Sequence, residues 1–158
     1  MALPNYKGHI AGGIITFVLF CFIMLGLRPS FFIGIEWLFF TIAGALFPDV
    51  DIKSKGQKYF YWFVFLFFMI LTIKECFEII TGLAFIIIIP MLVRHRGIFH
   101  SPRFVIIIPL IAWVVVSSFF PTFSMRFLYD IIFFIAGALS HLVLDFGLKH
   151  MMRRLLKL

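Results

Sequence analysis

Seven of the nine histidine and aspartate residues lie in four short segments of this 158-residue sequence, which are called clusters below. These candidate metal ligands are His9; Asp49 and Asp51; His95 and His100; and His141 and Asp145. Imidazole and carboxylate groups in one site suit Zn²⁺ first, or Mn²⁺ and Fe²⁺, better than Ca²⁺, which takes only oxygen ligands. Seven ligands exceed one tetrahedral set, so we expect either two metal ions, or one ion with some residues in supporting roles.

The last cluster, in the sequence SHLVLD, has the spacing of a helical pair. His141 and Asp145 are four residues apart, so both side chains project from one face of a helix. Such a pair can share a metal ion, or the carboxylate can orient the imidazole of a ligand histidine. The structural alternative is a buried pair without a metal, whose hydrogen bonds are completed by groups on neighbouring helices. Because ionisable residues inside a membrane are costly, we favour the functional interpretation.

The second cluster follows a predicted helix end. In ALFPDVD, the position of Pro48 predicts that the helix ends there, so that Asp49 and Asp51 can turn back toward the end of the helix. The alternative is an acidic turn that is solvated and has no further role. As carboxylates beside the other clusters, both aspartates are candidate catalytic groups as well as candidate ligands.

The third cluster precedes a predicted helix. In RHRGIFHSP, Gly97 permits a tight turn between His95 and His100. Ser101 and Pro102 are typical of an N-cap residue and a first helical residue, which would hold His100 at the start of the helix. His100 is therefore our third candidate catalytic group, although a pair of loop histidines can also be simple solvent-exposed residues.

The elements that must position these clusters are membrane-spanning helices. The sequence is 63% apolar and only 13% charged, and its mean hydropathy is +1.13, whereas soluble domains average about 45–50% apolar and about 25% charged residues. Six apolar segments lie near residues 9–27, 31–48, 59–73, 77–93, 104–120 and 127–148. We predict an all-α, polytopic transmembrane bundle in one integral membrane domain, residues 1–158, with about six spans and a short third span.

Basic residues indicate the orientation, because cytoplasmic loops carry an excess of Lys and Arg. With six spans, one side of the membrane receives Lys7, Lys53, Lys55, Lys58, Arg94, Arg96, Arg103, Lys149, Arg153, Arg154 and Lys157, and the other receives Arg28, Lys74 and Arg126. This asymmetry predicts that both termini and all the candidate ligands lie on the cytoplasmic side. Topology and contact with anionic membrane lipids also account for the net charge of +7, so we expect no nucleic-acid partner.

A five-residue repeat precedes two of the clusters. IAGAL occurs at residues 42–46 and again at residues 135–139, in both cases one to two helical turns before acidic or histidine residues. Both segments are predicted to run toward the cytoplasm. Small residues such as Gly44 and Gly137 let helices approach closely, which would bring the clusters together. The repeat is too short to prove an internal duplication.

At these motifs the sequence resembles the YdjM-like family of inner-membrane proteins, which are described as metal-dependent hydrolases. The resemblance covers nearly the whole chain and rests on His9 with Gly12 and Gly13, on FPDVD at residues 47–51, on HRGIFHS at residues 95–101 and on SHLVLDF at residues 140–146. It implies that the seven candidate ligands are metal-binding or catalytic, with Arg96 and Ser101 as supporting polar residues. It implies an inner-membrane location and leaves the substrate open.

We expect hydrolysis of an ester, foremost a phosphoester, in a lipid or another membrane-associated substrate. A catalytic metal lowers the pKa of its bound water toward about 7, which makes hydroxide available beside the bilayer. Lys53, Arg96, Ser101 and Arg103 can bind an anionic headgroup at the rim of the site, although basic residues that set topology need no such role. The short loops leave little protein outside the membrane to bind a bulky soluble substrate.

Three alternatives use the same residues. A zinc-dependent lipid amidase needs similar ligands. A metal-ion transporter predicts polar groups through the depth of the membrane, where the sequence offers mainly Thr16, Thr41 and Thr81. A scaffold would use the cluster only to lock helix packing, and it predicts stable folding without metal. The sequence predicts no particular oligomeric state.

Overall fold

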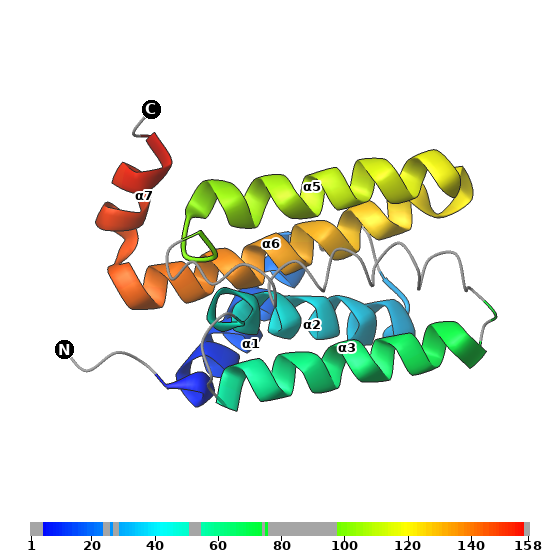
Figure 1. Cartoon of the computed structure of the whole chain (residues 1–158), viewed down its shortest axis with the longest axis horizontal. Coiled ribbons are helices and arrows are strands. Elements are labelled where there is room, and N and C mark those ends of the chain that lie inside the picture. Colours follow the sequence, from blue (N-terminus) through cyan, green and yellow to red (C-terminus); the bar gives the residue numbers. More distant parts are fainter. Residues whose placement is uncertain are drawn as a thin grey trace.

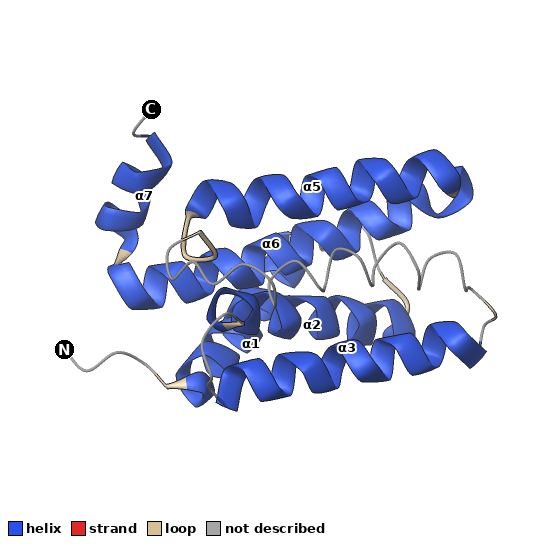
Figure 2. Cartoon of the chain, viewed as in Figure 1, coloured by secondary structure: helices blue, strands red, loops and turns tan. Residues whose placement is uncertain are grey.

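The computed structural model describes residues 5–23, 26, 29–50, 55–73, 75 and 98–156. All the regular elements in these ranges are helices (Figure 2). They are α1 (Tyr6–Ile23), α2 (Phe31–Leu46), η2 (Phe47–Asp49), α3 (Lys55–Ile73), α5 (Pro102–Phe119), η3 (Pro121–Phe123), α6 (Ser124–Phe146) and α7 (Leu148–Leu156). The predicted all-α class is confirmed.

Four helical segments are long and apolar enough to cross a membrane: α1, α2 with η2, α5 and α6. The predicted third span corresponds to α3, which begins at Lys55 rather than near residue 59. Its 19 residues measure about 28 Å, so it is less short than the apolar run suggested. The extra turn is polar, with Lys55, Gln57 and Lys58. The fourth predicted span, residues 77–93, lies outside the described residues.

The pair α2 and α6 is the centre of the bundle, and the two helices run in the same direction (Figure 1). Their contact is reciprocal. A Cβ atom on Gly44 would lie 2.0 Å from the carbonyl oxygen of Phe134, and one on Gly137 would lie 2.0 Å from that of Thr41. Larger side chains at either position would force the backbones apart. The close approach predicted for the two IAGAL segments is therefore confirmed.

The remaining helices cover this central pair. α1 packs against both α2 and α6, and α5 packs against α6 (Figure 1). A cluster of buried apolar residues lies toward the end of the bundle where α2 and α6 finish; it includes Leu46, Phe47, Phe60, Phe99, Val105, Leu142 and Met151. The outward-facing side chains of α1, such as Ile15, Leu19 and Phe22, are exposed and apolar, which suits contact with lipid.

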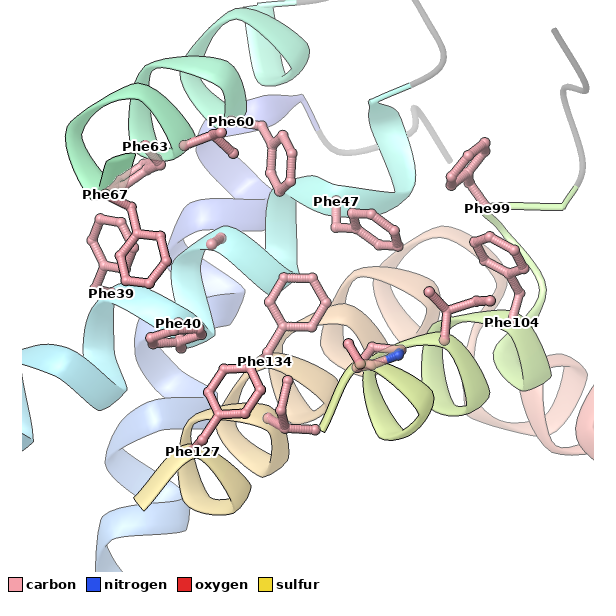
Figure 3. A pocket seen from close by; sticks show the side chains of 16 residues that line it. Phe39, Phe40, Phe47, Phe60, Phe63, Phe67, Phe99, Phe104, Phe127 and Phe134 are labelled. Atoms are coloured by element: carbon pink, nitrogen blue, oxygen red, sulfur yellow. The ribbon is translucent and has the colours of Figure 1, made fainter. Parts of the chain in front are cut away.

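An apolar pocket of about 190 Å³ lies between α2, α3, α5 and α6 (Figure 3). The phenylalanines that line it are Phe39, Phe40, Phe47, Phe60, Phe63, Phe67, Phe99, Phe104, Phe127 and Phe134. On the opposite face of α3, Trp62, Phe65 and Leu66 are exposed. The aromatic residues of this helix thus divide between packing and the outer surface, and no polar side chain marks the pocket as a cofactor site.

Candidate metal centre

Five of the seven candidate ligands converge at one end of the bundle, from four different segments. They are His9 in α1, Asp49 in η2, His100 in the turn before α5, and His141 and Asp145 in α6. The two remaining candidates, Asp51 and His95, lie outside the described residues, as do Lys53 and Arg96. The convergence rests on residues more than 130 positions apart, which local spacing alone does not bring together.

His9 reaches the site because α1 starts just before it and packs closely on α2. The side chain of Asn5 accepts hydrogen bonds from the backbone N–H groups of Lys7 and Gly8, at 3.1 and 3.3 Å, which caps the helix. One turn later, a Cβ atom on Gly13 would lie 3.0 Å from the Cβ atom of Ala45. This small residue lets α1 approach α2 and leaves the imidazole of His9 buried.

Asp49 and His100 are positioned by tight turns that are anchored by buried apolar residues, Phe47 and Val50 in one turn and Phe99 in the other. Asp49 ends η2, where Pro48 is followed by a turn closed by the hydrogen bond from Val50 N–H to the Phe47 carbonyl. His100 follows the buried Phe99, and Ser101 N–H donates to the Ile98 carbonyl at 3.0 Å. These turns hold both side chains at the mouth of the bundle.

The predicted start of the fifth helix is confirmed at Ser101 and Pro102, although the Ser101 side chain makes no capping hydrogen bond. The N-cap role of this residue is therefore conformational. Its backbone has the extended geometry of an N-cap, and Pro102 supplies the fixed φ of the first helical residue.

His141 is the most deeply placed ligand candidate, with a side chain that is 0% exposed. Its Nδ1 atom lies 2.7 Å from the carbonyl oxygen of Ala45. A carbonyl oxygen can only accept, so Nδ1 donates, and in the neutral ring Nε2 then carries a lone pair. That Nε2 atom makes no hydrogen bond. It faces carboxylate oxygens of Asp145 and Asp49, at 3.2 and 3.7 Å.

Asp145 is the hub of the cluster. Its Oδ1 atom lies 3.4 Å from Nε2 of His9, and its Oδ2 atom lies 3.5 Å from Nε2 of His100 and 3.2 Å from Nε2 of His141. The second carboxylate, Asp49, approaches Nε2 of His100 at 3.6 Å. Three imidazole nitrogens therefore surround one carboxylate, and the predicted single-face pairing of His141 with Asp145 is confirmed.

Apart from the 3.2 Å between His141 and Asp145, these distances are longer than ordinary hydrogen bonds and suit ligand atoms that share a metal ion. Nitrogen–oxygen hydrogen bonds are about 2.7–3.2 Å long, whereas ligand atoms about 2.1 Å from a tetrahedral ion lie roughly 3.4 Å from one another. Two sets, His9–His141–Asp145 and Asp49–His100–His141, each have donor atoms within 4.8 Å of one another. A cation among them would also resolve the opposition between the His141 lone pair and two anionic oxygens.

Stacking holds the imidazole rings in place. The rings of His9 and His141 stack with centroids 3.7 Å apart and an interplanar angle of 13°. The ring of Phe146 lies edge-on to His100, with centroids 6.1 Å apart. Rings that are fixed by packing lose little entropy when they bind an ion, so this arrangement is preorganised.

The carboxylates also control the protonation of His100. In the protein without metal, Asp145 and then Asp49 stabilise its imidazolium form and raise the pKa of His100 to about 9, against an opposing effect of burial. A metal ion on Nε2 would therefore have to displace a proton at neutral pH.

Arg103, the described basic residue expected to bind a headgroup, is directed at α7. Its Nε and Nη2 atoms both donate to the carbonyl oxygen of Leu155, each at 3.2 Å. This interaction satisfies an unpaired carbonyl at the end of α7. The expected role of Arg103 in substrate binding remains a proposal, and an anionic ligand there would have to share the guanidinium with this carbonyl.

Two contributors to the site have no signal in the sequence. The Ala45 carbonyl orients His141 through the backbone, which no side-chain pattern can indicate. Phe146 belongs to the SHLVLDF motif, but a phenylalanine among 24 does not stand out as a packing partner for a histidine.

Residues 5–151 match the model of the YdjM inner membrane protein family. This match covers most of the chain and includes the five clustered residues, so the chain belongs to that family. No curated protein and no solved structure matches the chain. The family confirms the resemblance seen in the sequence and, with the apolar helices, supports a location in the inner membrane.

Proposed function

We propose that this member of the YdjM inner membrane protein family is a metal-dependent hydrolase. It acts at the cytoplasmic end of the bundle, on a phosphoester of a lipid or another membrane-associated substrate. The observation that carries the proposal is the orientation of His141. Its Nδ1 is committed to the Ala45 carbonyl, and its buried Nε2 faces two carboxylates at distances suited to shared coordination.

We assign the more buried residues of the cluster to metal binding, and we expect the metal to be zinc. His9, His141 and Asp145 form one of the two candidate sets, and His9 and His141 are fully buried. Two imidazoles and one carboxylate are a common ligand set for catalytic zinc, which keeps a further position open. Because the two candidate sets share the single available nitrogen of His141, the described residues favour one ion over two.

The more accessible residues are the ones we assign to proton transfer. Asp49 and His100 have side chains that are 22% and 16% exposed, and their facing atoms are 3.6 Å apart. Asp49 accepts the proton of the water that attacks phosphorus, and His100 donates a proton to the oxygen that leaves when the ester bond breaks. A bound divalent metal would supply a water of lowered pKa and stabilise charge on the phosphoryl oxygens.

The location of the cluster favours a substrate within the membrane surface. The ligands lie where α2 and α6 end, so a lipid headgroup can reach them while its acyl chains remain in the bilayer (Figure 1). Positive charges predicted on this face, including Lys53 and Arg96, favour an anionic phosphoester over a neutral amide.

The decisive experiment measures metal content and lipid turnover on the same preparations. Protein purified in mild detergent is dialysed against buffer with trace zinc, manganese or iron, and bound metal is counted by mass spectrometry. Wild type, His141→Ala and the control His150→Ala, an exposed histidine of α7, are compared. We expect about one metal ion in wild type and His150→Ala, and little in His141→Ala.

The same proteins are then incubated with a panel of lipid phosphoesters, carboxylic esters and amides. Phosphoester turnover that is lost in His141→Ala supports the proposal. Turnover of an amide only would replace the phosphoester assignment with the lipid amidase. Stoichiometric metal with no turnover of any lipid would favour a metal-handling or transport role, and a wild-type protein that binds no metal would overturn the proposal.

A further inference from the structure

The last described helix, α7, is strongly amphipathic. Its apolar residues, Leu148, Met151, Met152, Leu155 and Leu156, occupy one arc of the helix, and Lys149, His150, Arg153 and Arg154 occupy the other. A short helix with leucine and methionine on one face and basic residues on the other has the pattern of a helix that lies in a membrane interface.

Only half of the apolar arc is used for packing within the protein. Met151 is buried in the apolar cluster, and Leu155 is half-buried. Leu148, Met152 and Leu156, spaced four residues apart, form a stripe that is 62%, 42% and 72% exposed. Lys149 and Arg153 border this stripe and are exposed as well.

The direction of α7 places this stripe along the membrane plane. α6 ends at Phe146, and Gly147 has a positive φ of 75°, which lets the chain turn sharply. α7 then runs across the bundle axis at the end where α6 finishes, and the spanning helices lie along that axis (Figure 1). A helix in this position lies parallel to the surface of the bilayer, at the level where the spans end.

The helix is fixed in that position by three contacts. Met151 packs into the core, Arg103 donates to the Leu155 carbonyl, and the guanidinium of Arg154 lies 4.1 Å from the centroid of the Phe146 ring. The exposed stripe is therefore held outward by the fold and is not the surface of a free tail.

We propose that α7 is an interfacial helix that binds anionic lipid. Leu148, Met152 and Leu156 insert at the boundary between headgroups and acyl chains, and Lys149 and Arg153 bind the phosphate groups of anionic headgroups. Charge favours lipid over a second copy of the chain, because a symmetric α7 contact would bring the basic residues of two copies together. This inference does not depend on hydrolase activity.

α7 also lies close to the candidate metal centre. The Phe146 ring contacts the guanidinium of Arg154 on one side and lies edge-on to His100, with ring centroids 6.1 Å apart. Arg154 of α7 therefore lies one aromatic ring away from His100 of the histidine–aspartate cluster.

Spin labelling tests the depth of the helix. Single cysteines are introduced by Leu148→Cys, Met152→Cys and Arg153→Cys in a full-length chain whose native Cys21 and Cys76 are replaced by serine. The labelled proteins are placed in nanodiscs of phosphatidylcholine with phosphatidylglycerol, and collision rates with oxygen and with a water-soluble nickel complex are compared.

We expect the labels at 148 and 152 to collide preferentially with oxygen, as in the acyl region, and the label at 153 to collide preferentially with nickel. Nickel preference at all three positions would mean that α7 lies in water, which overturns the proposal. Protection of 148 and 152 from both reagents would mean that protein covers the stripe, and that outcome would replace lipid with a second copy.

Counting bound lipid tests whether the basic residues Lys149 and Arg153 contribute to lipid binding. Native mass spectrometry counts phosphatidylglycerol bound to wild type, to Lys149→Gln/Arg153→Gln and to the matched control Lys55→Gln/Lys58→Gln, which removes two exposed charges from α3. Since each basic residue near an anionic surface contributes roughly fivefold to association, we expect a loss of at least about tenfold for the α7 variant. The control should lose clearly less, because the ammonium group of Lys55 lies over the Tyr6 ring. Equal loss in both variants would overturn a specific role for α7.

Discussion

The two ends of the α2–α6 pair contain charged residues that are stabilised in different ways. At the far end, Arg126 of α6 donates from Nε and Nη2 to a carboxylate oxygen of Glu36 in α2, and the Nε distance is 3.1 Å. At the near end, the partners of Asp49 and Asp145 are the imidazoles of three histidines. At the far end the carboxylate of Glu36 has a permanent cation as its partner, whereas the near end depends on protons or a metal.

This difference separates an ion pair that fastens two helices from a site that exchanges ligands. An arginine stays protonated at any physiological pH, so Arg126 can serve only as a fixed partner. Imidazole changes its charge near neutral pH and coordinates metals when neutral. The near end can therefore respond to its surroundings, and the predictions below test whether the two ends behave independently.

The largest effect is expected where both ends depend on the same helix contact. Gly137→Val would place side-chain atoms on the Thr41 carbonyl, so α2 and α6 must separate. We expect the free energy of unfolding to fall by more than about 3 kcal/mol. This exceeds the usual cost of overpacking, because the added side chain clashes with backbone atoms, which cannot move aside as a side chain can. The measurement is thermal unfolding in detergent followed by circular dichroism.

Gly34→Ala is the matched control, because a Cβ atom at Gly34 of α2 meets nothing within 4 Å. This variant should be neutral or more stable by up to about 1 kcal/mol. Equal destabilisation in the two variants would show that glycine flexibility, and not the close contact, determines the effect.

The next largest effect should be confined to the near end. Asp145→Asn removes the charge at the hub of the cluster, and we expect zinc affinity to fall by at least about 100-fold. Glu36→Gln should leave affinity unchanged, since about 28 Å of α6 separates Asp145 from the Arg126–Glu36 pair. Isothermal titration of metal-free protein with zinc measures both. Unchanged zinc affinity in Asp145→Asn would remove Asp145 from the proposed ligand set.

A smaller effect follows from the protonation of His100. Its raised pKa of about 9 means that, in the metal-free protein, its interaction with the carboxylates stabilises the fold fully below about pH 6.5 and ceases to do so as pH rises through about 9. Zinc binding should have the opposite dependence, because zinc on Asp145 takes that carboxylate away from the His100 imidazolium and a divalent cation beside His100 favours its neutral form. We expect the apparent affinity to rise by up to about tenfold per pH unit between pH 6.5 and 9.

His100→Gln provides the control for both pH dependences. Gln at this position does not titrate, so the decline in metal-free stability above pH 6.5 should disappear. The zinc affinity should also become less steep with pH, although His9 and His141 still bind as neutral rings. A wild-type protein whose metal-free stability is flat from pH 6.5 to 9 would contradict the raised pKa.

The helices and the end of the bundle at which the clusters gather could be predicted, because hydropathy and charge can be followed from segment to segment along the chain. Long apolar runs predict the spans, and the distribution of basic residues orders them, which puts His9, Asp49, His100 and Asp145 on one side. The repeated small residues predict the close α2–α6 contact. Each of these inferences uses hydropathy, charge or side-chain size, and each is visible within a few residues.

Other features depend on tertiary contacts that the sequence does not encode locally. α3 begins earlier than its apolar run because a helix continues through Lys55 and Lys58 at no great cost when they reach water. The contact of Arg103 with Leu155 joins residues far apart in the chain, so a topogenic arginine and a binding arginine look alike in the sequence. The Ala45 carbonyl that orients His141 is a backbone group.

The smallest effect is expected at the far end. The Arg126 side chain is 55% exposed and that of Glu36 is 27% exposed, so Glu36→Gln should change stability by about 1 kcal/mol or less. Because the ends are far apart and share no partner, Glu36→Gln/Asp145→Asn should equal the sum of the single variants within about 0.5 kcal/mol. Unfolding of all three proteins with and without zinc measures this. Coupling clearly above that value would mean that the two ends act together, through the α2–α6 contact that joins them.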